Sequence, residues 1–82
     1  MEITVYTSST CVFCHSLKHW LDKEGYEYVE KSVDDGGEAL REMVELSGQR
    51  GTPFTAIRLE GSDTIEGVVG FDRLTIESIV KG

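Results

Sequence analysis

The spacing of apolar residues predicts a buried strand and then an amphipathic helix at the start of the chain. Residues 2–7, EITVYT, form a short run rich in β-branched side chains, which is typical of a buried strand. Thr10, at the end of the following turn, is placed to cap a helix, and Gly25 is expected to end it. Between about 12 and 24 the apolar residues recur at i, i+4, i+7 and i+8, on one helical face: Phe13, Leu17, Trp20 and Leu21.

The rest of the chain predicts three further strands and two further helices. Residues 26–33 alternate between apolar and polar and indicate a second strand, followed by a loop at 34–37. A second helix is expected to end at Gly48, and its apolar face is marked by Leu40, Met43, Val44 and Ser47. Strands at 54–59 and 64–69, joined by a tight turn at 60–63, are expected to form an antiparallel hairpin. A last helix is expected within 70–82, with Asp72 as its N-cap and Phe71 packed on Ile76.

This order, β-α-β-α-β-β-α, predicts an α/β fold. We expect a single domain over residues 1–82, with one four-stranded sheet and helices on both faces. The first two strands should be parallel, with a right-handed crossover through the first helix. Active sites in such sheets lie beyond the carboxyl ends of the parallel strands. Because SSTCVFC directly follows the first strand, the chemistry is expected at Cys11 and Cys14.

Charge narrows the range of partners. The formal net charge of the 82 residues is -7, with no basic cluster, so nucleic acid and anionic membranes are poor candidate partners. MEITVYT has neither a basic region nor an apolar core like those of signal peptides, and no stretch has the length of a membrane span. We therefore expect a cytoplasmic protein, and nothing in the sequence demands more than a monomer. In the cytosol a stable structural disulfide is unexpected, so the two cysteines point to reactivity or to metal.

The two cysteines support a redox hypothesis most directly. Cys11 is expected at the first position of a helix, where unpaired N–H groups and the helix dipole stabilise a thiolate. Cys14 is expected one helical turn away and deeper, close enough to form a disulfide with the first sulfur. A strand, a turn, C-x-x-C and an amphipathic helix together favour a nucleophile followed by a resolving thiol.

Three other interpretations of CVFCH are less favoured. A zinc site through His15 and His19 would need a distorted helix, and the chain has no second pair of ligands. Covalent haem attachment matches the five letters, but it takes place outside the cytosol. The two cysteines could also be small buried apolar residues.

The one proline of the chain, in RGTPFT, gives a second signal. Pro53 comes directly before a predicted strand, although a proline cannot donate to a strand ladder. A cis Thr52-Pro53 bond would leave the Thr52 backbone groups free to pair with an extended substrate. A trans proline that simply opens the strand is equally compatible with the sequence.

YTSSTCVFCHSLKHWLDKEG, then GTPFT, then GVVGFD together resemble the glutaredoxin family over essentially the whole chain. The resemblance implies a thioredoxin fold and glutathione-linked thiol–disulfide exchange on disulfide-containing proteins or glutathione mixed disulfides. Glutathione would be a co-substrate, with no tightly bound cofactor and no metal. Cys11 would be the nucleophile and Cys14 the resolving thiol. The residues expected to contact glutathione are Phe13, Arg50, Thr52, Pro53, Gly70, Phe71 and Asp72.

The sequence departs from the family pattern at two places beside the cysteines. Val12 stands where a proline is common, and residues 8–10 lack the usual lysine; Arg50 is a candidate replacement for that cation. C-V-x-C is also typical of NrdH-type redoxins, which are reduced by thioredoxin reductase and donate electrons to ribonucleotide reductase. This chain keeps only Gly-Phe of the Trp-Ser-Gly-Phe-Arg-Pro stretch of that group. A third alternative, of another class, is a metal or iron–sulfur carrier.

Overall fold

The computed structural model describes residues 1–34 and 36–81, and within them seven elements follow one another in the predicted order. Asp35, in the predicted loop at 34–37, and Gly82, at the end of the last predicted helix, lie outside the described residues. The elements are β1 (Glu2–Thr7), α1 (Val12–Lys23), β2 (Val29–Ser32), α2 (Glu38–Ser47), β3 (Phe54–Arg58), β4 (Ile65–Val69) and α3 (Arg73–Lys81).

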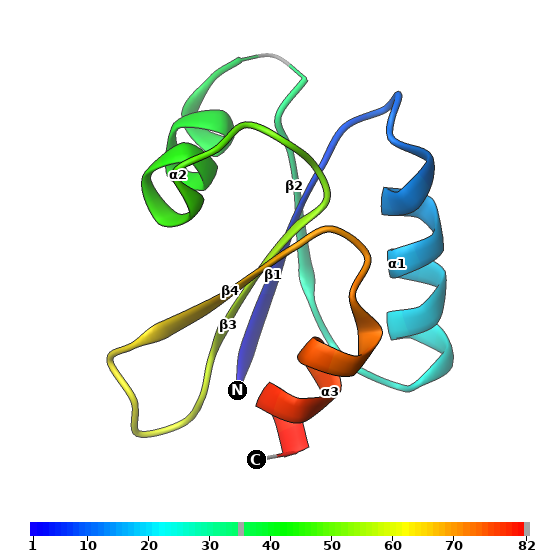
Figure 1. Cartoon of the computed structure of the whole chain (residues 1–82), viewed down its shortest axis with the longest axis vertical. Coiled ribbons are helices and arrows are strands. Elements are labelled where there is room, and N and C mark those ends of the chain that lie inside the picture. The colour runs from blue at the N-terminus through cyan, green and yellow to red at the C-terminus, as the bar shows by residue number, and fades with distance from the viewer. Residues whose placement is uncertain (35, 82) are drawn as a thin grey trace.

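The described strands form one mixed sheet in the order β2-β1-β3-β4. β1 and β2 are parallel, as expected for strands joined through a helix, and β3 is antiparallel to both β1 and β4. At the centre of the sheet Val5 lies opposite Glu30 on one side and opposite Thr55 on the other. In Figure 1 the first turn of α1 lies at the end of the sheet where β1 finishes. The predicted architecture is therefore confirmed.

The helices cover both faces of the sheet, and each face packs against its helices through a separate hydrophobic core. On one face Ile3, Val5 and Ile57 pack with residues of α1 and α3, Leu17 and Ile76 among them. On the other face Phe54 packs with Tyr6, Ala56 and Met43 of α2. Because neighbouring residues of a strand point to opposite faces, β3 contributes to both cores. This alternation places Thr55 and Ile57 on the α1 side and Phe54 and Ala56 on the α2 side.

The bounds of three strands, β2, β3 and β4, are narrower than those predicted. β2 contains only Val29–Ser32, because Tyr26 and Tyr28 pack against the core under α1 instead of pairing in the sheet. The β3–β4 connection is longer than a tight turn and runs from Leu59 to Thr64. Gly48 ends α2 as predicted, with a left-handed φ of 73° that a glycine adopts without strain.

No helix within the described residues 1–34 and 36–81 combines the length and the apolar character needed to cross a bilayer.

Candidate active site

The two cysteines lie at the start of α1, just beyond the carboxyl end of β1. Cys11 is the N-cap of the helix, with extended backbone, and its Sγ accepts a hydrogen bond of 3.1 Å from the backbone N–H of Cys14. The prediction that Thr10 caps this helix was therefore wrong. Sulfur takes the place of a capping oxygen because the chain turns into the helix one residue later than expected.

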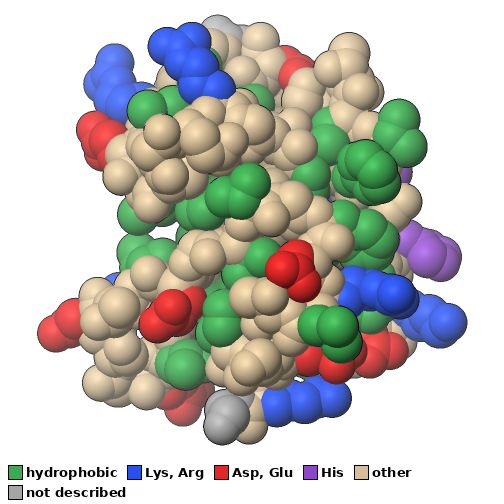
Figure 2. All heavy atoms as spheres, viewed as in Figure 1, with side chains coloured by type: hydrophobic (Ala, Val, Ile, Leu, Met, Phe, Trp, Pro, Cys, Tyr) green, Lys and Arg blue, Asp and Glu red, His purple; other side chains and the backbone are tan. Residues whose placement is uncertain are grey.

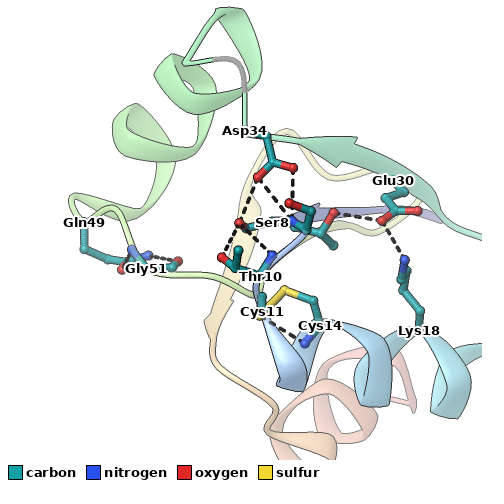
Figure 3. The surroundings of a disulfide bond; sticks show 11 residues. Ser8, Thr10, Cys11, Cys14, Lys18, Glu30, Asp34, Gln49 and Gly51 are labelled. Carbon is teal, nitrogen blue, oxygen red and sulfur yellow. Dashed lines mark hydrogen bonds and ion pairs between the residues drawn. A yellow bond between two sulfur atoms is a disulfide. The ribbon is translucent and has the colours of Figure 1, made fainter.

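Cys11 and Cys14 are joined as a disulfide, with their Cα atoms 5.3 Å apart (Figure 3). The predicted difference in depth between the two is also present. Cys11 is half-buried, whereas Cys14 is only 1% exposed and is the first core residue of α1. An incoming sulfur compound can therefore reach Cys11 but not Cys14. This asymmetry is the arrangement that a nucleophile and a resolving thiol require.

A carboxylate from another part of the chain fixes the loop before Cys11. Asp34 accepts a hydrogen bond of 2.8 Å from the Ser8 hydroxyl and two of 3.1 Å from the Ser9 backbone N–H (Figure 3). The hydrogen bonds from Ser8 and then from Ser9 hold the pKa of Asp34 below its usual value. Ser8 in turn is linked to Cys11, whose N–H donates to the Ser8 carbonyl at 3.1 Å. Sequence reasoning missed Asp34, because its partners lie 25 and 26 residues earlier in the chain.

A second polar network borders the site on the β2 side. Glu30 accepts hydrogen bonds of 2.8 Å from the buried Thr7 hydroxyl and from Lys18 Nζ (Figure 3). These two donors, Lys18 first, lower the pKa of the Glu30 carboxyl from 4.5. Lys18 is one helical turn beyond Cys14, so the network ties α1 to β2 beside the disulfide. The negative charge of Glu30 and the positive charge of Lys18 compensate one another.

The Thr52-Pro53 peptide bond is cis, which decides between the two predicted alternatives. Pro53 is fully buried, and its carbonyl accepts a hydrogen bond of 2.8 Å from the Gly70 N–H. Gly70 has a φ of 85°, a conformation that other residues rarely adopt. This hydrogen bond brings together two segments, 52–53 and 70–72, that the sequence analysis singled out separately. Among the described residues, neither backbone group of Thr52 has a hydrogen-bond partner.

Phe71 and Asp72 play the predicted structural roles at the start of α3. The Asp72 carboxylate accepts hydrogen bonds from the Thr75 N–H at 3.2 Å and from the Thr75 hydroxyl at 2.7 Å. These bonds, that of the hydroxyl first, keep the pKa of Asp72 below its usual value. Phe71 is partly buried against the core cluster that contains Ile76, as expected for a hydrophobic staple. Asp72 is therefore a capping residue whether or not it also meets a ligand.

Phe13 and Arg50 are both exposed at the surface. Phe13 is 63% exposed and Val12 is 74% exposed, so the first turn of α1 presents apolar side chains to solvent. Figure 2 shows hydrophobic side chains at the surface in this part of the molecule. Arg50 lines a shallow groove beside α2, together with Leu40, Arg41 and Val44. Within the described residues, no three side chains of His, Cys, Asp or Glu come together as a set of metal ligands.

The loop before Pro53 is held by its own side chains. Gln49 donates to the Ser47 hydroxyl at 3.2 Å and to the Gly51 carbonyl at 3.0 Å, and its Oε1 accepts a short hydrogen bond from the Gly51 N–H. The Ser47 hydroxyl lies within hydrogen-bond distance of two acceptors, the carbonyl of Met43 at 2.6 Å and that of Gln49 at 3.0 Å, so the end of α2 is continuous with the loop. The approach to the cis proline is therefore fixed by local hydrogen bonds that the sequence analysis did not identify.

A mixed sheet with a C-x-x-C disulfide at the start of its first helix and a cis proline before β3 defines a thiol–disulfide protein of thioredoxin fold. The glutaredoxin family model matches residues 3–59, and the chain belongs to the glutaredoxin family.

Relatives of similar length extend the likeness over nearly the whole chain. A glutaredoxin of Neisseria meningitidis serogroup B is 33% identical over 81 residues, which are 98% of this chain and 92% of that protein. A glutaredoxin-like 8.6 kDa protein of the rubredoxin operon in Clostridium pasteurianum is 29% identical over 79 residues, 96% and 97% of the two chains. The solved structure of NrdH-redoxin from Escherichia coli superposes with a TM-score of 0.72 at 26% identity, and covers 96% of this chain and 95% of that one. The family and the fold implied by the resemblance are thus confirmed.

Proposed function

We propose that this glutaredoxin-family oxidoreductase draws its electrons from glutathione and uses them to reduce protein disulfides or glutathione mixed disulfides. The observation that carries the proposal is the pairing of the half-buried Cys11 with the buried Cys14 at the start of α1. Glutathione itself is supported by the Pro53–Gly70 hydrogen bond, which sets the unpaired backbone groups of Thr52 beside the start of α3. An extended peptide could pair with Thr52 while an anionic end meets the N–H groups of the helix.

The reaction proceeds by two exchanges at sulfur. The Cys11 thiolate attacks one sulfur of a substrate disulfide, forms a mixed disulfide and releases the other sulfur as a thiolate. Cys14, as a thiolate, then attacks the Cys11 sulfur, which releases the reduced substrate and leaves the Cys11–Cys14 disulfide. Two glutathione molecules restore the dithiol and leave as oxidised glutathione. In a shorter route, glutathione attacks the mixed disulfide on Cys11 directly, and Cys14 is not needed.

A second candidate is an NrdH-type donor to ribonucleotide reductase that is itself reduced by thioredoxin reductase. The observation that favours it is the loop before Cys11, where Ser8 and Ser9 bond to a carboxylate, Asp34, at a place where the family often carries a lysine. An anionic tripeptide gains no charge partner from this loop. The structural relative from Escherichia coli is described as having a thioredoxin-like activity profile.

The test compares the two electron sources on the same oxidised protein. NADPH consumption is followed with glutathione plus glutathione reductase, and in parallel with thioredoxin reductase. The proposal predicts turnover with glutathione; turnover with thioredoxin reductase alone would replace it by the NrdH-type function. Cys11→Ser should abolish all turnover. Cys14→Ser should abolish only the dithiol route, so its residual activity on a glutathione mixed disulfide separates the two mechanisms.

A cytoplasmic location and action as a monomer belong to the same proposal.

The remaining alternative, a metal or iron–sulfur carrier, makes a different prediction for the isolated protein. Anaerobic expression would then give a brown protein with visible absorbance, whereas the enzyme is expected to be colourless with two titratable thiols.

A further inference from the structure

One buried hydroxyl, that of Thr55, has no hydrogen-bond partner. Thr55 is 0% exposed, and its Oγ1 is the one buried side-chain oxygen or nitrogen without a partner among the described residues. A buried hydroxyl that bonds to nothing destabilises a fold, so most such groups in native proteins have a partner. A valine would have almost the same shape without this cost. The hydroxyl therefore calls for an explanation outside the stability of this form of the protein.

The sheet register places Thr55 on the face of the sheet that packs against α1 and α3. Its strand neighbours Val5 and Val68 are both buried in the cluster that packs against Leu17. Thr55 is the second residue of β3 and lies two residues after Pro53, farther from the end of the sheet where the cysteines are. Along α1, Cys14 lies one turn before Leu17, on the same buried face and toward the end where Pro53 is found. Cys14 and Thr55 are thus both buried between α1 and the face of the sheet that this helix covers.

The other polar groups around this core are bonded to other partners or exposed to solvent, so the Thr55 hydroxyl is the donor that remains. On β1, the Thr7 hydroxyl already donates to Glu30, and Lys18 of α1 pairs with the same carboxylate. α3 contributes Ile76 to this core. Among the titratable groups nearby, His15 of α1 is exposed to solvent and Asp72 is bonded to its own helix.

Cys14 needs a donor in only one redox state. In the disulfide its sulfur is neutral, and burial costs little. In the mixed-disulfide state it must become an anion inside an apolar core, where an unpaired charge is strongly disfavoured.

We propose that the Thr55 hydroxyl donates a hydrogen bond to the Cys14 thiolate and thereby promotes the resolving step. The inference rests on the proposed dithiol function. In that step the Cys14 thiolate forms a bond to the Cys11 sulfur, the bond between Cys11 and the substrate breaks, and the substrate sulfur leaves with the electron pair. The Cys14 proton has passed to solvent beforehand. When the disulfide closes, Thr55 loses its partner, which is the state that the structure shows.

The test separates the two exchanges with a coloured aryl disulfide, dithiobis(nitrobenzoic acid). The reduced protein releases one aryl thiolate when Cys11 attacks and a second when Cys14 resolves the mixed disulfide. Thr55→Val should slow the second release roughly tenfold to a hundredfold, since hydrogen bonds to charged groups are among the stronger ones. It should also move the pH profile of that release toward alkaline pH. Thr55→Ser, which keeps the hydroxyl, should restore both. The oxidised Thr55→Val protein should unfold at a urea concentration no lower than wild type.

The matched control is Thr55→Val in the Cys14→Ser background, where only the first release exists and its rate should not change. An unchanged second release in Thr55→Val, or an equal slowing of the first release in the control background, would overturn the role of Thr55 and leave the dithiol function intact. A wild-type protein that releases only one aryl thiolate would overturn both.

Discussion

Replacing Gly67 by alanine should destabilise the protein, although the residue is exposed on an edge strand. Gly67 lies on β4 opposite Ala56, and a Cβ at this position would be 2.8 Å from Cζ and 2.9 Å from Cε1 of Phe54. The ring cannot move aside easily, because Phe54 is 1% exposed and packs against Tyr6 with ring centroids 5.9 Å apart. Overpacking of this kind costs about 1–3 kcal/mol.

The expected net loss is about 1–2 kcal/mol, because alanine also reduces the freedom of the unfolded chain and so contributes about 0.4–1 kcal/mol in the opposite direction. For a domain of this size that corresponds to a fall in Tm of about 4–8 °C per kcal/mol. Urea unfolding of the oxidised protein measures the free energy directly, and the slope of the transition should not change.

The matched control is the same substitution in a Phe54→Leu background, where the two ring atoms that the new methyl group would meet are absent. There Gly67→Ala should cost little or should stabilise the protein, which gives a coupling energy of about 1–3 kcal/mol in the double-mutant cycle. Equal effects in the two backgrounds, or a gain in stability in the wild-type background, would refute the reasoning.

Three further perturbations test the polar contacts around the site. Burial first, and then the hydrogen bond to Glu42, raises the pKa of Tyr6 to about 12. The contribution of Tyr6 to stability is therefore complete below pH 10 and is lost as the pH rises toward 12. Tyr6→Phe should make this alkaline loss smaller in urea titrations. The lowered pKa of Glu30 means that its contribution is complete above pH 4.5 and is lost as the pH falls through the folded-state value. Glu30→Gln should therefore be less stable at neutral pH and lose less stability in acid; a parallel pH dependence would contradict this. Gln49→Ala should speed hydrogen exchange at the Gly51 amide, measured by NMR, and an unchanged rate would show that the side chain does not hold the loop.

The elements of the fold were predictable because local patterns determine them. The spacing of Leu17, Trp20 and Leu21 predicted the buried face of α1, and two strands joined by a turn predicted the β3–β4 hairpin. Phe13 was placed on that buried face wrongly, because it is 63% exposed and the buried face begins at Cys14. The limits of β2 were not predictable, because Tyr26 and Tyr28 alternate as in a strand but pack under α1. Their position depends on tertiary contacts that no local pattern contains.

The cysteines were predictable as a pair, and their surroundings were not. C-x-x-C after a strand indicated both the chemistry and the depth of Cys14. The contact between Asp34 and Ser8 and the hydrogen bond between Gly70 and Pro53 join segments far apart in the chain. The unpartnered hydroxyl of Thr55 was equally invisible, because threonine in a strand is ordinary until the register shows what surrounds it.

The most direct test of the account is the accessibility of the two sulfurs during exchange. The oxidised protein is incubated with a reduced glutathione buffer, quenched with iodoacetamide at short times and mapped by mass spectrometry. The account predicts that glutathione is found on Cys11, and that Cys14 in the same molecule is the thiol released from the disulfide. Glutathione on Cys14, or a disulfide that opens only when the protein is unfolded, would contradict the assignment of Cys11 as the nucleophile.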